Sequence, residues 1–309
     1  MNYRLKLLTL TIFFCIALWA RPLVAQEAHG RNLLLLADSL AVKNLEEVVV
    51  TATRSGREQG ALPLPVTLIK KEQIAQMGSL RLNQVLTEQT GLAVVQGHGE
   101  GLQVQGFDPD YTLIMIDGEP LIGRTAGTLS LDRIAVGNIK QIEIIKGPSS
   151  SLYGSEALAG VVNIITENPE KNSGEVFARY GANHTADLSG SFSAKGEKTG
   201  INVFANRYSS AGYDFTPETF GATVAPFTNY TFTSKLSHKF SDNWHLSVSG
   251  RYFREAQDQG FLVNSAGQQR QVAGQGTQSD WNLLPLLTGT LGDHWKVTAR
   301  WYLSGFRAG

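Results

Sequence analysis

Cysteine is almost missing from this 309-residue chain, whose single cysteine, Cys15, lies in an apolar stretch near the N-terminus. Without further cysteines the chain is not a disulfide scaffold, and it offers no thiolate ligands for a metal. Net charge is missing as well, since 27 basic residues balance 27 acidic ones. This balance argues against a nucleic-acid-binding protein that depends on a broad basic surface.

Long apolar runs occur only at the N-terminus, and no later run is long enough for a transmembrane helix. Arg4 and Lys6 precede the apolar segment "LLTLTIFFCIALWA", and the sequence "LVA" ends in a small residue at Ala25. A basic, an apolar and a small-residue segment in this order predict a secretory signal peptide over residues 1–25. An uncleaved anchor helix is the alternative.

Patterns of catalytic or metal-binding residues are also absent. The six histidines form no pair at metal-ligand spacing, and we expect His238 and His245 on the polar faces of strands. No Ser/His/Asp or paired-carboxylate arrangement stands out, so the sequence indicates no enzyme, cofactor or metal site. Asp214 and Glu218 share one long connection, which by itself is weak evidence for a hard cation.

The chain contains two regions of different periodicity. Residues 60–168 predict a mixed α/β domain, which begins with a short strand at Val66–Ile69. A helix should follow, with Ser79 as its N-cap and Gly91 as its stop. The Asp-Gly pair in "TLIMIDGEPLIG" predicts a hairpin, and a last strand is expected at Val161–Ile165.

Residues 169–309 alternate apolar and polar side chains with period two. In "TADLSGSFSAK", Leu188 lies on one face and Asp187 on the other. Such strands, with aromatic ends and alternately tight and long connections, are typical of an outer-membrane barrel. We expect "DQGFLVNSAGQQRQVAGQG" to be a long loop, and Pro285 makes its strand the poorest fit. A soluble sandwich also alternates and is the alternative.

The segment "EEVVVTATRS" (46–55) is rich in β-formers but has no hairpin partner near it in the sequence. We expect it to add as a strand to the sheet edge of a partner protein, through main-chain hydrogen bonds. The alternative is an edge strand in the chain's own sheet.

Several segments together resemble one family, the TonB-dependent outer-membrane receptors. "EEVVVTATRS" is similar to the TonB box, "LNQVLTEQTGLAVV" to the early plug helix and strand, and "YTLIMIDGEPL" to the central plug hairpin. "IEIIKGPSSSLYGSEALAGVVNIIT" resembles the motif that ends the plug. The resemblance implies an α+β plug domain followed by antiparallel strands of a transmembrane β-barrel. It divides the chain into signal peptide, extension with TonB box, plug and first barrel strands, at 1–25, 26–59, 60–168 and 169–309.

The resemblance also implies partners and sites. The C-terminal domain of TonB would pair with a TonB box formed by Glu47, Val48, Val49, Val50, Thr51, Ala52 and Thr53. A small ligand would bind outward-facing plug loops at Asp108, Asp110, Tyr111 and Arg124, where Arg124 suits an anionic ligand and Tyr111 an aromatic one. The implied substrate is a ferric siderophore, with cobalamin and haem as rivals. The mature chain would lie in outer-membrane lipid with a periplasmic N-terminus.

Two features depart from the family pattern. Gln105 stands where the family often has an arginine, so a plug-to-barrel contact made by that arginine would be weaker here or would lie elsewhere. About seven strand candidates are present, where the large plugged barrels have roughly 22, so we expect a fragment with an incomplete barrel. Alternatives of another class are a non-transporting binding module with a soluble β-domain and a signal-transducing receptor.

Overall fold

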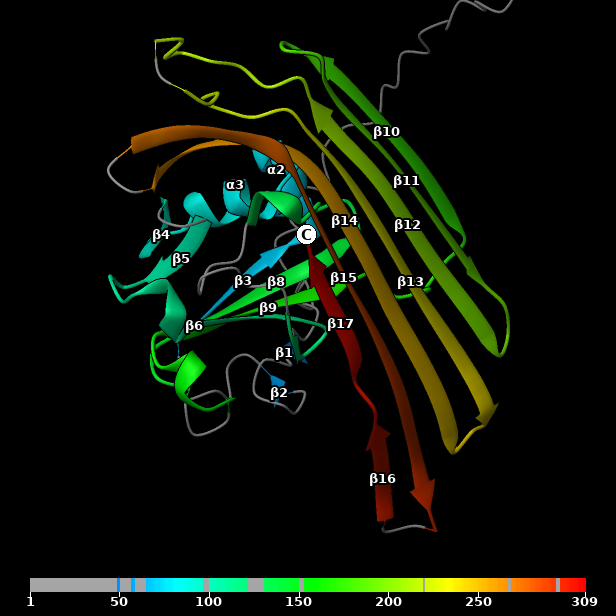
Figure 1. Cartoon of the computed structure of the whole chain (residues 1–309). Helices are drawn as coiled ribbons and strands as arrows, with labels where there is room; N and C mark the ends of the chain where they lie inside the picture. The colour runs from blue at the N-terminus through cyan, green and yellow to red at the C-terminus, as the bar shows by residue number, and fades with distance from the viewer. Residues whose placement is uncertain are drawn as a thin grey trace, which may run out of the picture. The chain divides into compact units, whose positions relative to one another are not determined.

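The structure is a computed structural model that describes residues 49–50, 57–58, 65–96, 100–121, 131–149, 153–218, 220–265, 268–292 and 295–309. A mixed α/β domain ends with a strand at Gly160–Thr166, and one long antiparallel sheet follows it from Ser173 (Figure 1). Within these ranges, no helix is both long and apolar enough to cross a membrane.

A five-stranded sheet in the order β3-β8-β9-β6-β7 forms the centre of the α/β domain. Its strands are β3 (Val66–Lys70), β6 (Thr112–Ile116), β7 (Glu119–Pro120), β8 (Ile139–Lys146) and β9 (Gly160–Thr166). Strands β6 and β9 pair in parallel, and the other neighbours are antiparallel. Isoleucine and valine fill these strands because both faces of the sheet are buried, each against its own apolar cluster.

Two short helices and a hairpin cover one face of this sheet. The elements are α2 (Lys71–Met77), α3 (Leu82–Thr87), β4 (Leu92–Gln96) and β5 (Glu100–Val104). Three 3-10 turns complete the domain: η3 (Pro109–Tyr111), η4 (Leu131–Arg133) and η5 (Ser155–Ala157). Helix α3 buries Leu82, Val85 and Leu86 completely, as their helical spacing predicts.

The predicted cap and stop of this helix are wrong. Helix α3 begins at Leu82 with Arg81, not Ser79, at the cap position. The side-chain oxygen of Gln84 accepts the Arg81 backbone N–H at 3.3 Å, so the first turn needs no serine oxygen. Gly91 does not end the helix either: with φ +76° it forms the turn into β4, after the helix has ended.

The predicted Asp-Gly hairpin is confirmed between β6 and β7. Asp117 and Gly118 have φ values of 51° and 85°, which a two-residue type I′ turn requires at both positions. The Asp117 carboxylate also accepts the backbone N–H of Thr166 at 3.0 Å and its hydroxyl at 2.7 Å. The turn is therefore fixed to the end of β9.

The long sheet has eight strands, of which β16 and β17 share one position beside β15, so the number is close to the roughly seven candidates in the sequence. Its strands are β10 (Ser173–Gly181), β11 (Thr185–Lys195), β12 (Thr199–Ser210), β13 (Phe227–Ser241), β14 (Trp244–Ser265), β15 (Gln268–Leu291), β16 (Trp295–Arg300) and β17 (Leu303–Ala308). Each strand from β10 to β14 pairs antiparallel with the next, and β16 and β17 both pair antiparallel with β15. Over the described residues the sheet is not closed, since β10 lies at one edge and β16 with β17 at the other.

Pro285 explains why the last strand is interrupted. Its carbonyl accepts the backbone N–H of Trp301 at 3.0 Å, so its nitrogen faces the same neighbouring strand. That nitrogen has no hydrogen to donate, and the ladder breaks at Trp301–Tyr302, between β16 and β17. On the other side Pro285 pairs normally with Val248 of β14. The strand thus forms despite its proline.

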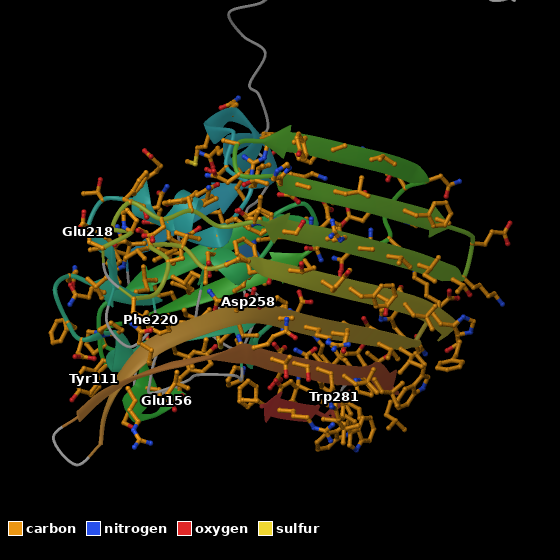
Figure 2. All side chains as sticks on the ribbon, turned by 45° about the horizontal axis from the view of Figure 1, so that its top comes forward. Tyr111, Glu156, Glu218, Phe220, Asp258 and Trp281 are labelled. Atoms are coloured by element: carbon orange, nitrogen blue, oxygen red, sulfur yellow. The ribbon has the colours of Figure 1, made fainter. Side chains whose placement is uncertain are left out.

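The two faces of the long sheet are reversed relative to a soluble sheet. Leu188 is 53% exposed and Val176 80%, whereas Asp187 on the opposite face is almost fully buried. Cross-strand tryptophans lie flat on glycines of the exposed face: Trp244 covers Gly289, and Trp281 covers Gly305. Figure 2 shows Trp281 on this outer surface. The soluble-sandwich alternative needs two apolar faces packed together, and this sheet does not show that arrangement.

One expectation for the faces is wrong. His238 shares the exposed face with Phe240, whose ring lies 4.8 Å from the His238 ring, centroid to centroid. The period of two places both residues on the same side, so His238 does not belong to the polar face. His245 does, and its Nε2 lies 2.9 Å from the hydroxyl of Ser237.

The region predicted as a long loop after β14 is mostly strand. Strands β14 and β15 pair residue by residue from Trp244↔Gly289 to Ser265↔Gln268. They therefore form a hairpin that projects beyond the neighbouring strands (Figure 1). The alternation of glutamine and glycine with apolar residues allows this extension, because extended backbone needs no buried core when its ladder is complete. The connection between β12 and β13, residues 211–226, is a true loop at the same end of the sheet.

A partner for the β-prone N-terminal segment is present within the chain, contrary to expectation. Strand β1 (Val49–Val50) pairs antiparallel with β2 (Arg57–Glu58) in a separate two-residue ladder. The alternative of an edge strand in the domain's own sheet is also wrong, because neither strand joins β3–β9. Residues 51–56 between them lie outside the described residues.

Candidate functional site: the polar interface between the α/β domain and the long sheet

The buried face of the long sheet is polar and carries most of the buried charge in the chain. Its buried polar residues are Asp187, Ser193, Asn202, Asn206, Asn229, Thr231, Lys235, Arg251, Glu255 and Asp280. Buried polar groups are costly unless they have partners. Some pair within the sheet, such as Arg251 with Asp280, and others pair with the α/β domain.

Arg81 makes the most deeply buried contact between the two parts. Its Nη2 donates to Asp187 of β11 at 2.8 Å, and its Nη1 donates to Asn206 of β12 at 3.1 Å. The guanidinium also stacks 3.9 Å from the ring centre of Tyr208. Asn206 completes the cluster, since its amide donates to Asp187 at 2.7 Å. Both charged side chains of the pair are only 4% exposed.

The backbone of the α/β domain positions this arginine. Arg81 forms an isolated bridge with Ala135, and the neighbouring Leu82 N–H donates to Ile134 at 3.0 Å. Burial lowers the pKa of the Arg81 guanidinium, while the charge of Asp187 acts in the opposite direction. The buried Nε of Arg81 has no hydrogen-bond partner. The pair is therefore strongly oriented but incompletely satisfied.

A second group of contacts holds the β6–β7 hairpin against β13 and the last strand. Lys235 of β13 lies 3.1 Å from the Asp117 carboxylate in the hairpin turn. Arg300 of β16 lies 2.9 Å from Glu119, and the Tyr302 hydroxyl donates to the Pro120 carbonyl at 2.9 Å. Here the α/β domain supplies the anions and the sheet the cations, the reverse of the Arg81 contact.

Between these two groups the parts approach closely. A Cβ added to Gly137 would lie 2.7 Å from Phe204 of β12, so only glycine fits there. The adjacent Asn138 donates from its amide to the Thr233 hydroxyl at 2.7 Å.

A cavity of about 410 Å³ separates the α/β domain from β10, β11 and β12 beside the Arg81 contact. Its wall includes Arg81, Asp187, Asn206 and, from β10, Glu175 and Arg179. The hairpin contacts surround a much smaller space of about 40 Å³. The domain is therefore packed tightly near the hairpin and loosely near Arg81.

The predicted ligand residues that are described lie together on an exposed turn. The Asp108 carboxylate accepts the backbone N–H of Asp110 at 3.1 Å and starts η3, which ends at Tyr111. Tyr111 is 43% exposed, and Phe107 and Leu158 beside this turn are similarly open. The Tyr111 carbonyl accepts the Ala159 N–H at 2.9 Å, which joins η3 to the η5 segment. Arg124 lies outside the described residues.

Figure 2 shows Tyr111 and Glu156 toward the end of the sheet where the β14–β15 hairpin projects, with Glu218 and Phe220 of the 211–226 loop also at that end. Asp214 organises this loop, as its carboxylate accepts the Thr216 N–H at 2.9 Å and the Thr223 hydroxyl at 3.2 Å. The Thr216 hydrogen bond is the main reason that the pKa of Asp214 is lowered. The Asp214 carboxylate is thus occupied in the loop, which leaves no support for a cation shared with Glu218.

Sequence reasoning missed the Arg81–Asp187 pair. Two features of the sequence point to it: Arg81 stands between Leu80 and Leu82 just before a buried helix, and Asp187 is the single acidic side chain on the polar face of its strand. Gln105, by contrast, is an exposed turn residue with φ +53°. The ion pairs between domain and sheet lie at Arg81 and at the β6–β7 hairpin.

Asp187→Asn tests how much the buried pair holds. The change leaves the Arg81 cation without its counter-charge. Breaking a buried pair in this way lowers the free energy of unfolding by about 3–5 kcal/mol. We expect the α/β domain to become protease-sensitive at a much lower urea concentration. The control is Glu170→Gln, which removes the exposed pair with Lys140 and should change stability by less than about 1 kcal/mol. Equal shifts in the two variants would contradict the assigned role.

Comparison with known proteins agrees with this architecture. Residues 58–161 match the family model described as the TonB-dependent receptor plug domain. The fold of 85% of the chain resembles the alcaligin outer-membrane receptor of Bordetella pertussis, with TM-score 0.65 and 15% identity over 42% of that chain. The ferripyoverdine receptor of Pseudomonas aeruginosa gives TM-score 0.66 and 16% identity, covering 84% of this chain and 37% of that one.

The ferric yersiniabactin uptake receptor of Yersinia pestis is similar to the same extent, with TM-score 0.64 and 14% identity over 84% of this chain and 44% of the other. The chain thus spans less than half the length of these receptors. At such identities the likeness concerns the fold. The α/β domain thus matches the family model of the TonB-dependent receptor plug domain, and the α/β domain and the strands after Pro169 together have the fold of the outer-membrane receptors compared.

Proposed function

We propose that this protein is a TonB-dependent receptor of the bacterial outer membrane that imports a ferric siderophore. The observation that carries the proposal is the plug domain held by polar contacts on the inner face of a sheet whose outer face is apolar. The receptors of similar fold are named for alcaligin, ferripyoverdine and ferric yersiniabactin. Those ligands belong to those proteins, and they motivate the choice of iron chelates as probes.

The outer face supports a place in the membrane. Exposed aliphatic and aromatic side chains cover it along every strand from β10 to β15, an area far larger than soluble proteins leave open to water. Lipid is the solvent that suits such a face, while the polar face meets the plug.

A pair of neighbouring substitutions tests this placement. Leu188→Arg puts a charge into lipid and should destabilise the receptor by roughly 2–4 kcal/mol at mid-depth. Ser189→Arg points the same charge into the 410 Å³ cavity and should be tolerated. The stability of both variants can be measured by thermal unfolding in detergent and by the amount of receptor in outer-membrane fractions. Equal tolerance of the two arginines would exclude a lipid-facing surface at Leu188.

For energy coupling, we propose that Glu47–Thr53 form a TonB box that becomes available in the periplasm after removal of the predicted signal peptide, residues 1–25. Within the part of the chain that the structure describes, Val49 and Val50 pair with Glu58 and Arg57. So short a ladder is marginal in water, and a longer ladder with TonB would replace it favourably. The extension before the plug would then serve as the connection through which TonB pulls.

Val49→Pro tests this coupling. Proline removes a ladder donor, so TonB binding and iron-chelate uptake should both be lost while the receptor still binds its ligand at the cell surface. The matched control is Val49→Thr, which keeps the N–H and the β-branched shape and should retain uptake. Normal uptake by the proline variant would contradict pairing at this position.

For the ligand, we propose the exposed plug turn around Asp108, Asp110 and Tyr111, together with Arg124. Loops held by a rigid domain are common binding sites, and Tyr111 offers an open aromatic surface beside Phe107. This turn and the loops of the sheet's projecting end would approach the ligand from two sides.

Tyr111→Ala should weaken binding of the transported chelate by up to about tenfold, because a stacking contact contributes roughly 0.5–1.5 kcal/mol. Tyr111→Phe keeps the ring and should bind normally. Ferric alcaligin, ferripyoverdine and ferric yersiniabactin are suitable probes, in binding and growth assays of an iron-starved host. Unchanged binding of an accepted probe by the alanine variant would remove Tyr111 from the site.

A further inference from the structure

Asp187 has two arginine neighbours, one from each part of the molecule. Arg81 of the plug binds it at 2.8 Å, and Arg179 of β10 lies 4.0 Å from the same oxygen, Oδ2. Arg179 is directly opposite Asp187 in the β10–β11 ladder. One carboxylate therefore has two cations in reach, of which only Arg81 makes a hydrogen bond.

The two arginines differ in what holds them. Arg81 is enclosed by Asn206 and the Tyr208 ring and is almost inaccessible, whereas the Arg179 side chain is 44% exposed. Arg179 also lines the 410 Å³ cavity, which leaves room for it to move toward Asp187. Asn206 donates to Asp187 independently of Arg81 and belongs to the sheet, so it remains in place if the plug moves.

Removing one partner of a buried ion pair is costly because the other charge is left uncompensated. If the plug withdraws Arg81, Asp187 becomes such a charge on the inner wall of the sheet. We propose that Arg179 then takes the place of Arg81 on Asp187, so that the wall carboxylate exchanges one arginine for another as this part of the plug detaches. Arg179 is thus a positioning residue for plug release, a role that rests on the proposed transport function.

The exchange makes the plug easier to open at Arg81 than at the β6–β7 hairpin. Lys235 pairs with Asp117 and also donates to the Thr166 carbonyl at 3.3 Å, both in the plug, and Arg300 pairs with Glu119. Among the described residues within salt-bridge distance, no second sheet carboxylate faces Lys235 or Arg300. The portion of the plug near α2 and α3 should therefore separate first.

A thiol reporter measures this opening without requiring transport. Val85 in α3 is fully buried, and Cys15, in the predicted signal peptide, is the single natural cysteine. In a Val85→Cys receptor, thiol labelling reports how often α3 becomes exposed. Arg179→Gln should slow labelling roughly tenfold, a coupling of ordinary size for contacting charges, because the open state loses its substitute cation.

Whether Arg179→Gln slows or speeds labelling distinguishes the arginine exchange from a simple stabilisation of the docked plug. If Arg179 merely strengthens the docked state, its removal speeds labelling, and the proposal is overturned; an unchanged rate overturns it too. In an Arg81→Met background, Arg179→Gln should no longer slow labelling, since Asp187 has the same partners before and after opening. Slowing of the same size in that background also counts against exchange.

Arg179→Lys is the matched variant, since it keeps the cation and should label at the rate of the parent reporter; slow labelling of this variant would contradict the exchange. In cells, Arg179→Gln should slow energised uptake of whichever ferric siderophore probe supports growth, with surface binding unchanged. If the parent receptor takes up none of the probes, the proposed function fails, while the labelling result still decides whether the arginines exchange.

Discussion

A sheet whose apolar side chains mostly point outward holds another domain on its inner face mainly through polar contacts. This constraint determines the rest of the structure. The plug domain folds around its own apolar core of isoleucines, leucines and valines, so it needs no apolar surface from the sheet. What joins the two is a small number of ion pairs and hydrogen bonds, such as Arg81 with Asp187 and Asp117 with Lys235.

Under the proposed transport function the plug is first held and later released, and polar attachment suits both states. Buried ion pairs contribute little net stability, since desolvation offsets much of their attraction, but their geometry is specific. The Arg81 contact shows both properties: Arg81, Asn206 and Arg179 lie around the Asp187 carboxylate, yet the Arg81 Nε lacks a partner. A cavity next to it and tight packing near Gly137 make the attachment uneven along the interface. In the proposed transport cycle, the loosely packed side near Arg81 is where opening of the plug would begin.

Short sequence patterns predicted the structure best where the feature depends on residues close together in the chain. The Asp117-Gly118 turn, the burial of Leu82, Val85 and Leu86, and the alternation along β11 all follow from short-range rules, and the structure confirms them. The prediction of Ser79 as the N-cap was wrong because Gln84, inside the helix, supplies the capping oxygen. The prediction of a long loop after β14 was wrong because cross-strand pairing makes these polar, glycine-rich segments form strands, although they have little strand preference of their own. Of the proposed binding residues, Asp108, Asp110 and Tyr111 do share one exposed turn, and their role stays a prediction.

The sequence by itself determined the division into a mixed α/β domain and an alternating sheet, the two faces of that sheet, and the resemblance to TonB-dependent receptors. These depend on periodicity and on contiguous motifs, which are properties of neighbours along the chain. Only the tertiary structure decided that Arg81 meets Asp187 across 106 positions, that Arg179 stands opposite the same carboxylate, and that Pro285 breaks the last strand. Such contacts arise from the register of strands and the docking of one domain on another. No local pattern encodes that geometry, because each partner is chosen by where the backbone places it.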